Sequence, residues 1–221
     1  MRDLMVHEKF EIEVMERLNS QKLLGPLVFG GGTMLRLCYD LNRYSADLDF
    51  WFVKEIDVPR YHRKMKAFLN SIYSVSDAHS KRFSLVYEFR SADYPRQLKM
   101  EIRKGVKECK WKELIAFSRH SNLQIPVRAM TLDQMMRNKI EAFRDRREIR
   151  DCFDIEFILR KGIPIKASRQ ELETMREGIA QFKARDYSVT LGSLLEKETR
   201  ELYKKNRFEY LSGSIAALLS E

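Results

Sequence analysis

Two aspartates one residue apart, Asp47 and Asp49, lie in the apolar segment DLDFWFV. Alternate side chains of a β-strand point to the same face, so these carboxylates would project together, about 6.6 Å apart along the backbone. Two like charges held side by side on a half-buried face are costly unless cations neutralise them. Carboxylate oxygens of this kind suit Mg²⁺. The pair therefore predicts a metal site; the alternative is two surface charges on an edge strand.

Three glycines precede this pair, in the run FGGGT, and an amphipathic helical pattern follows at once. Glycine tolerates a positive φ and lets a ligand lie against the backbone. The first N–H groups of a helix have no partner within the helix and favour anions. The run predicts a phosphate-binding turn, and the alternative is a tight turn that packing requires. It matches neither the Gly-Lys-Ser/Thr ending of a P-loop nor the spaced glycines of a dinucleotide-binding turn.

The whole segment GGTMLRLCYDLNRYSADLDF, residues 31–50, resembles the opening signature of the AbiEii/AbiGii-type nucleotidyltransferases, a family of the polymerase-β-like superfamily. In that family a Gly-Gly-Thr turn leads into a helix that carries an arginine, and an Arg-x-Ser-x-Asp-Leu-Asp-Phe segment supplies metal ligands. The resemblance implies that the nucleotide is bound by Gly31, Gly32, Thr33, Arg36, Ser45 and Lys139. It assigns the metal to Asp47, Asp49 and Glu101.

The resemblance returns at two places downstream. Glu101, in LKMEIRK, stands where the superfamily has a third acidic residue on a later strand; its alternative is a solvent-facing glutamate among lysines and arginines. The segment NKIEAFRDRREIRDCFDIEFIL resembles the family's helical region, which implies that Lys139 stabilises the phosphates and that Asp151 orients this lysine. Asp151 equally suits the first turn of a helix, where a negative charge is favourable. Asn138 departs from the pattern, in which an acidic residue often precedes the lysine.

The resemblance implies attack of a hydroxyl on the α-phosphate of an NTP, with Mg²⁺ as cofactor, Mn²⁺ as its substitute and pyrophosphate as leaving group. The implied catalytic residues are Asp47, Asp49, Glu101, Lys139 and Asp151. We expect RNA, at the acceptor end of tRNA, as the acceptor, and the role of a toxin in a toxin–antitoxin or phage-defence system, with an antitoxin as partner. One alternative keeps the enzyme and changes the acceptor to a protein or small-molecule hydroxyl. Another is an inactive module of the same fold that binds RNA or a partner.

The order of apolar patterns predicts an α+β fold: a polymerase-β-like core with a mixed sheet flanked by helices, followed by a C-terminal helical bundle. We expect the core over residues 1–122 and the helical domain over residues 123–221, packed on the core and completing the site. Strands are predicted at 27–31, 47–53, 82–90 and 96–104, and helices at 3–22, 33–41, 60–73 and 131–162. Thr131 or Asp133 is the expected cap of the last helix, and Gly162 its end.

The composition narrows the partners. The net charge is +9, which favours polyanions such as nucleic acid. The basic run formed by Arg144, Arg146, Arg147 and Arg150 is interpreted either as a track for an RNA backbone or as a solvated helix face paired with neighbouring acids. Three cysteines without paired spacing argue against a disulfide framework or a zinc site. No apolar run reaches the length of a membrane span, and no secretory signal opens the chain, so the expected location is the cytoplasm.

Overall fold

The computed structural model describes residues 2–106 and 108–220. The chain divides into two compact units, which are described separately. The sheet unit comprises Met1–Asp40 and Tyr44–Met130, and the helical unit comprises Leu41–Arg43 and Thr131–Glu221. Three residues from the first quarter of the sequence therefore belong to the helical unit.

The sheet unit is built on one mixed sheet of seven strands in the order β3-β4-β5-β2-β1-β7-β6. β2 runs antiparallel to β1 and parallel to β5, and β1 also runs parallel to β7, so the two central strands are paired on both sides. The strands are β1 (Leu27–Gly30), β2 (Asp47–Phe52), β3 (Ser74–Ser80), β4 (Ser84–Arg90), β5 (Leu98–Arg103), β6 (Trp111–Phe117) and β7 (Gln124–Met130). The predicted mixed sheet is confirmed, while β3, β6 and β7 were not predicted.

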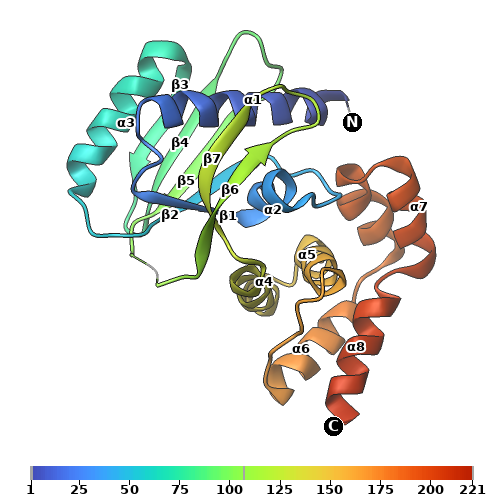
Figure 1. The fold of residues 1–221 in the computed structure, drawn as a ribbon. Coiled ribbons are helices and arrows are strands. Elements are labelled where there is room, and N and C mark those ends of the chain that lie inside the picture. Colours follow the sequence, from blue (N-terminus) through green and yellow to red (C-terminus); the bar gives the residue numbers. More distant parts are fainter. Residues whose placement is uncertain (1, 107, 221) are drawn as a thin grey trace. The chain divides into compact units, whose positions relative to one another are not determined.

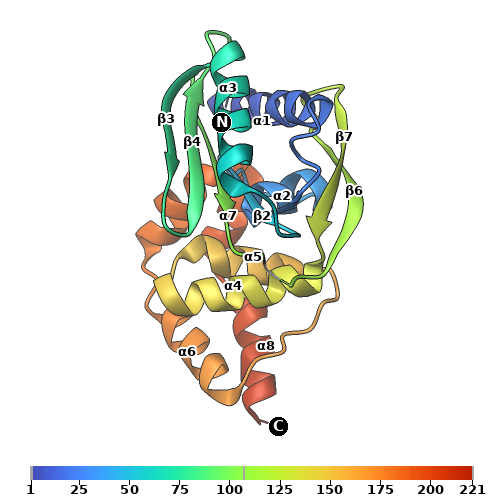
Figure 2. The same cartoon turned by 90° about the vertical axis from the view of Figure 1, so that its left-hand side faces the viewer.

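Helices cover one face of this sheet. α1 (Arg2–Ser20) and α3 (Val58–Ile72) run along that face (Figure 1), and Figure 2 shows both helices together with α2 (Gly31–Tyr39) between the two ends of the curved sheet. α3 begins at Val58, slightly before the predicted start at residue 60, because the side chain of Asp57 accepts a hydrogen bond from the backbone N–H of Arg60 and a proline occupies the first turn.

Burial alternates along β2, the strand that carries the two aspartates. Leu48, Phe50 and Phe52 are buried, whereas the side chains between them are half-buried. The ring of Phe50 stacks on that of Phe29 with centroids 4.9 Å apart. The apolar side chains therefore face the core under the helices, and Asp47 and Asp49 share the opposite face of the sheet.

The helical unit contains α4 (Leu132–Arg146), α5 (Ile149–Arg160), α6 (Arg169–Ala180), α7 (Lys197–Asn206) and α8 (Glu209–Ser220), with a π-helical turn over Asp186–Leu191 and a 3-10 turn over Gly192–Leu194. Thr131 caps α4 as predicted, by accepting from the backbone N–H of Gln134. Gly162 lies just beyond α5 with φ +85°, the conformation expected of a glycine that ends a helix. An aromatic cluster of Phe153, Tyr203 and Phe208 is part of the core.

The last strand of the sheet, β7, ends at Met130, and the helical unit begins at Thr131. The sequence placed this boundary near residue 123, because mainly helix-forming patterns follow that point; the segment between, QIPVRAM, is the strand β7. Within the described ranges, no helix has both the length and the apolar character needed to cross a membrane.

Candidate active site

Three carboxylates share the open face of the sheet because of the strand register. Asp49 on β2 lies directly opposite Gly30 on β1 and opposite Glu101 on β5. Asp47 lies two residues earlier on β2, opposite Lys99. Directly paired residues of neighbouring strands point to the same face. Asp47, Asp49 and Glu101, which the sequence grouped by resemblance, are therefore side by side in the sheet unit.

The glycine turn lies against one of these carboxylates. Gly31, the first residue of α2, has φ +75°, and a Cβ atom at this position would stand 3.0 Å from both Cβ and Cγ of Asp49 and closer still to its Oδ2 atom. The N-cap, Gly30, offers no side-chain cap to the helix. The backbone N–H groups at the start of α2 thus stand beside the Asp49 carboxylate, where they can bind an anion.

Thr33 makes a structural contact to the strand that carries the aspartates. It is buried, and its hydroxyl donates a hydrogen bond of 2.6 Å to the carbonyl of Asp47. One turn of helix further, Arg36 is nearly buried; it pairs with Glu8 of α1, and its guanidinium lies 3.9 Å from the ring centroid of Tyr44. Both residues thus connect α2 to its surroundings within the sheet unit. Their predicted contacts with a nucleotide stay predictions.

The loop before β2 is fixed by α1. The Nε2 atom of His7 lies 2.9 Å from the carbonyl oxygen of Ala46, the residue before Asp47. Ser45, predicted to contact the nucleotide, is half-buried in this loop, which precedes the regular strand. The sequence reasoning missed His7, because a lone histidine in a helix of fair periodicity gives no sign of its long-range partner.

Glu101 is turned toward neighbouring cations. Its carboxylate lies 3.4 Å from Nε of Arg103 and 4.0 Å from Nζ of Lys99, and its side chain is 20% exposed. In the described part of the chain, no three His, Cys, Asp or Glu side chains converge closely enough to hold a metal ion. The donor types and the shared face suit Mg²⁺, but Glu101 must leave Arg103 to join the two aspartates.

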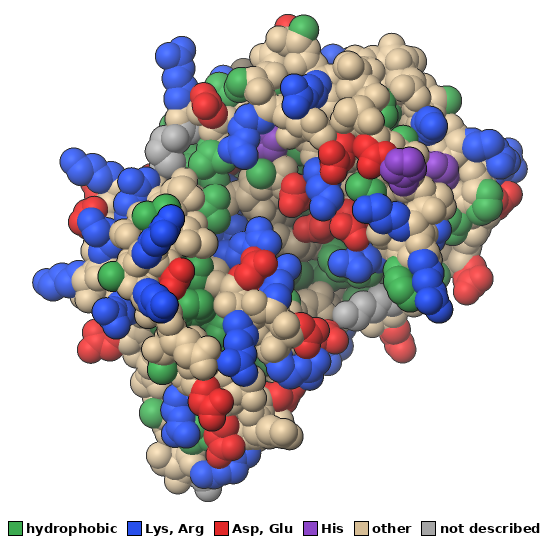
Figure 3. Space-filling model, turned by 180° about the vertical axis from the view of Figure 1, so that it is seen from behind, with side chains coloured by type: hydrophobic (Ala, Val, Ile, Leu, Met, Phe, Trp, Pro, Cys, Tyr) green, Lys and Arg blue, Asp and Glu red, His purple; other side chains and the backbone are tan. Residues whose placement is uncertain are grey.

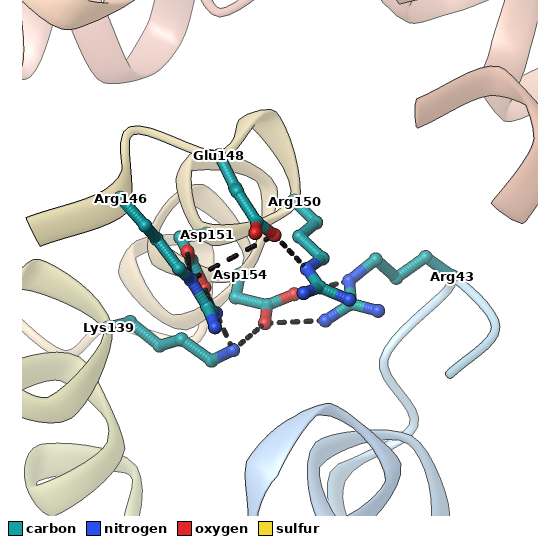
Figure 4. A network of polar contacts seen from close by, with 7 residues as sticks. All are labelled: Arg43, Lys139, Arg146, Glu148, Arg150, Asp151 and Asp154. Carbon is teal, nitrogen blue, oxygen red and sulfur yellow. Dashed lines mark hydrogen bonds and ion pairs between the residues drawn. The ribbon is translucent and has the colours of Figure 1, made fainter. Parts of the chain in front are cut away.

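The helical unit holds the second predicted group of residues, drawn in Figure 4. The ammonium of Lys139 lies 2.6 Å from Oδ2 of Asp154 and 3.2 Å from Oδ1 of Asp151. Arg43 binds both oxygens of Asp154, at 2.6 and 2.7 Å. Arg146 binds both oxygens of Asp151, at 2.7 Å each. The predicted pairing of Asp151 with Lys139 is thus present as a contact, and both aspartates are completely buried.

This network carries more positive than negative charge. The seven residues of Figure 4 are four cations, Arg43, Lys139, Arg146 and Arg150, and three anions, Asp151, Asp154 and Glu148. Burial alone raises the pKa of Asp154, but Arg43 and Lys139 outweigh it and lower that pKa below its usual value of 3.8. Asp154 therefore stays ionised at neutral pH, and the excess positive charge lets the group attract an anion.

The basic run around α4 and α5 is largely paired with acids. Arg144 contacts Asp145 and Glu171, and Arg150 contacts Glu148. Figure 3 shows the same mixing over one face of the molecule, where Lys and Arg side chains are interspersed with Asp and Glu. These contacts favour the interpretation of a solvated, ion-paired helix face.

Comparisons with known proteins point to one family. A family model described as "Nucleotidyl transferase AbiEii toxin, Type IV TA system" matches residues 13–218. A solved structure of a proposed nucleotidyltransferase from H. pylori is 20% identical, with a TM-score of 0.56 over 95% of this chain and 96% of that one. An antigenic nucleotidyltransferase-like protein from Paracoccidioides brasiliensis is 17% identical, with a TM-score of 0.49 over 90% of this chain and 96% of that one. None of the curated proteins compared with the sequence matches it. At such identities, the likeness to the H. pylori structure supports the fold alone.

Proposed function

The chain belongs to the AbiEii family of nucleotidyltransferase toxins of type IV toxin–antitoxin systems, and from that premise we propose that it transfers a nucleoside monophosphate from an NTP to a hydroxyl of RNA, at the acceptor end of tRNA. One observation carries the proposal. The Asp49 carboxylate lies against Gly31 at the start of α2, on the face that it shares with Asp47 and with its strand partner Glu101. Binding alone does not require carboxylates beside an anion-binding turn.

Each element of this arrangement has a task in the reaction. The backbone N–H groups of Gly31, Gly32 and Thr33, with the dipole of α2, hold the phosphates. Asp47 and Asp49 are the ligands that fit Mg²⁺, or Mn²⁺ in its place, and a bound ion would neutralise phosphate charge. The attacking hydroxyl loses its proton as its oxygen bonds to the α-phosphorus and the bond to pyrophosphate breaks. Glu101 accepts that proton once it has turned away from Arg103.

Lys139 supplies positive charge for the leaving pyrophosphate, and Asp151 orients the ammonium group of Lys139. This part of the proposal rests on the motif and on the surplus of cations around the two buried aspartates. Because the ammonium is already 2.6 Å from Asp154, a phosphate that draws on Lys139 must compete with a strong ion pair.

RNA as acceptor is supported by the net charge of +9 and by the family resemblance. A protein hydroxyl and a small-molecule hydroxyl are the competing acceptors, and an inactive binding module is the competing class. A cognate antitoxin is proposed from the family, which is described as part of a two-component system.

The test is transfer of label from each of the four α-labelled NTPs to tRNA, total RNA or total protein, with and without Mg²⁺. The variant Asp49→Asn keeps the size of the side chain and removes its charge. Glu113→Gln is the matched control, because Glu113 is an exposed carboxylate on edge strand β6 of the same sheet. We expect Mg²⁺-dependent label on tRNA, lost in Asp49→Asn and kept in Glu113→Gln. Label on protein alone would refute the RNA acceptor, and equal activity in both variants would refute the site.

A further inference from the structure

Two side chains hold the backbone on either side of Asp47. The Thr33 hydroxyl donates to the carbonyl of Asp47 at 2.6 Å, and Nε2 of His7 lies 2.9 Å from the carbonyl of Ala46. These two carbonyls belong to the peptide groups that follow and precede the α-carbon of Asp47. The direction in which the Asp47 carboxylate leaves the backbone is therefore set by α1 and α2 together.

The contact from His7 has a defined chemical form. A carbonyl oxygen only accepts hydrogen bonds, so Nε2 of His7 carries the proton and donates it. The Nδ1 atom is buried without a partner in the described part of the chain, and burial lowers the pKa of His7. The ring is thus neutral, with one tautomer selected by Ala46. Its side chain is 1% exposed, so water cannot readily take over this role.

An ion pair with the neighbouring Glu11 does not account for the position of the His7 ring. Glu11 lies one helical turn along α1, with Oε1 3.7 Å from Nε2 of His7. That oxygen is itself buried without a hydrogen-bond partner among the described residues. Among the residues that the structure describes, the one hydrogen bond that the ring makes is directed at the loop before β2.

This loop needs such a contact. Residues 44–46 lie outside any helix or strand, and β2 begins at Asp47, so the Ala46 carbonyl stands just before the first residue that the sheet register pairs. Unpaired backbone groups of a loop are free to change direction unless side chains hold them. In metal sites, residues that orient a ligand without touching the metal commonly affect metal affinity or activity by about 10- to 100-fold.

We infer that His7 is a positioning residue for the metal-binding strand: by holding the Ala46 carbonyl, it fixes the Asp47 carboxylate in the direction needed to bind a divalent cation. The inference rests on the proposed function of Asp47 and Asp49 as metal ligands. It goes beyond that function because it assigns a task to α1, which lies outside the glycine turn and the acidic strand.

The experiment measures Mn²⁺ binding directly, by electron paramagnetic resonance of the free ion, together with nucleotide transfer as a function of Mg²⁺ concentration. His7→Phe keeps a ring of similar size and removes the donor. His7→Gln replaces the ring by an amide whose N–H can donate to the same carbonyl. Val14→Ala, at a fully buried position of the same helix, is the control for general loosening of α1. Thermal unfolding of all variants is followed in parallel.

We expect His7→Phe to weaken Mn²⁺ binding about tenfold or more and to raise the Mg²⁺ concentration for half-maximal transfer by a similar factor. His7→Gln should recover most of the affinity, and Val14→Ala should keep it despite a lower melting temperature. Unchanged Mn²⁺ affinity in His7→Phe, or an equal loss in Val14→Ala, would overturn the inference.

These outcomes also separate the inference from the proposed function. If Asp49→Asn abolishes Mn²⁺ binding while His7→Phe retains it, the metal site stands and the positioning role is wrong. If the unaltered protein binds no Mn²⁺, the metal site fails and the positioning role fails with it.

Discussion

Replacing Gly31 with alanine tests whether the glycine turn and the acidic strand form one site. At this position the added methyl group meets two separate obstacles. The backbone has φ +75°, which L-residues other than glycine rarely adopt, and the new Cβ would stand 3.0 Å from Cβ and Cγ of Asp49 and closer to its carboxylate oxygen. Ordinary contacts of this kind are near 3.4 Å or longer. Either the turn or the Asp49 carboxylate must therefore move.

The two obstacles have different expected sizes. The left-handed backbone conformation costs about 1–2 kcal/mol in an alanine. Relieving the clash requires a movement of about 1 Å at the carboxylate, and misplacement of this size costs about 100-fold in rate, equivalent to about 2.7 kcal/mol of transition-state stabilisation. Gly162→Ala provides the matched control, because Gly162 has φ +85° and no atom within 4 Å of an added Cβ. Its substitution produces the backbone cost alone.

The assay compares both variants in urea unfolding and in nucleotide transfer at saturating NTP. Gly162→Ala should lose about 1–2 kcal/mol of unfolding free energy and keep its transfer rate. Gly31→Ala should lose at least as much stability and about 100-fold in transfer. In an Asp49→Ala background, the extra stability cost of Gly31→Ala should shrink toward that of Gly162→Ala. The reasoning is refuted if Gly31→Ala retains full transfer, or if its extra cost is unchanged in that background.

Three further predictions concern ionisable groups. Asp154→Asn should cost about 3–5 kcal/mol of unfolding free energy at pH 7, because Arg43 and Lys139 lose their buried anion. The folded-state pKa of Asp154 is lowered, so the stabilising effect of its carboxylate is present above about pH 4 and is lost as the pH falls through that pKa. The urea midpoints of the unaltered protein and the variant should therefore converge in acid. Burial raises the pKa of Glu11 well above 4.5. The folded state therefore binds this proton more tightly than the unfolded state does, and the free energy of unfolding falls as the pH rises above about 4.5. Glu11→Gln should make the melting temperature less dependent on pH between about pH 5 and pH 8. Burial raises the pKa of Cys38 to about 12, so this thiol should react with a disulfide reagent at pH 8 far more slowly than a free thiol does. Fast labelling would contradict the burial of the Cys38 side chain.

The site-bearing part of the fold was predictable because its sequence signals are local. β1, α2 and β2 follow one another within 27–52, and their apolar periodicity, glycines and alternating aspartates are visible without any long-range contact. The cap at Thr131 is likewise local. The seven-stranded mixed sheet with flanking helices confirms the fold class expected from these patterns.

The missed elements depend on tertiary contacts. β3, with the sequence SVSDAHS, has no apolar alternation and is held by its pairing with β4. β6 exposes Trp111, Ile115 and Phe117, so its apolar side chains do not mark a buried face. In α1, the buried side chains include His7, Glu8 and Glu11, and polar residues on a buried face blur the helical periodicity. Their partners, such as Ser118 for Glu8, are far away in the sequence.

Arg43 carries a consequence for how the protein is made. Its guanidinium binds a carboxylate 111 positions later in the chain, so on the ribosome the arginine emerges long before Asp154 exists. The three-residue strip Leu41–Arg43 groups with segments that are synthesised last, which makes the helical unit discontinuous. A fragment that starts at Thr131 would lack these three residues, and Asp154 would lose the two hydrogen bonds that it accepts from Arg43. Expression of the chain from Thr131 onward is therefore a poor route to the helical unit, and long-range closure of this kind slows folding.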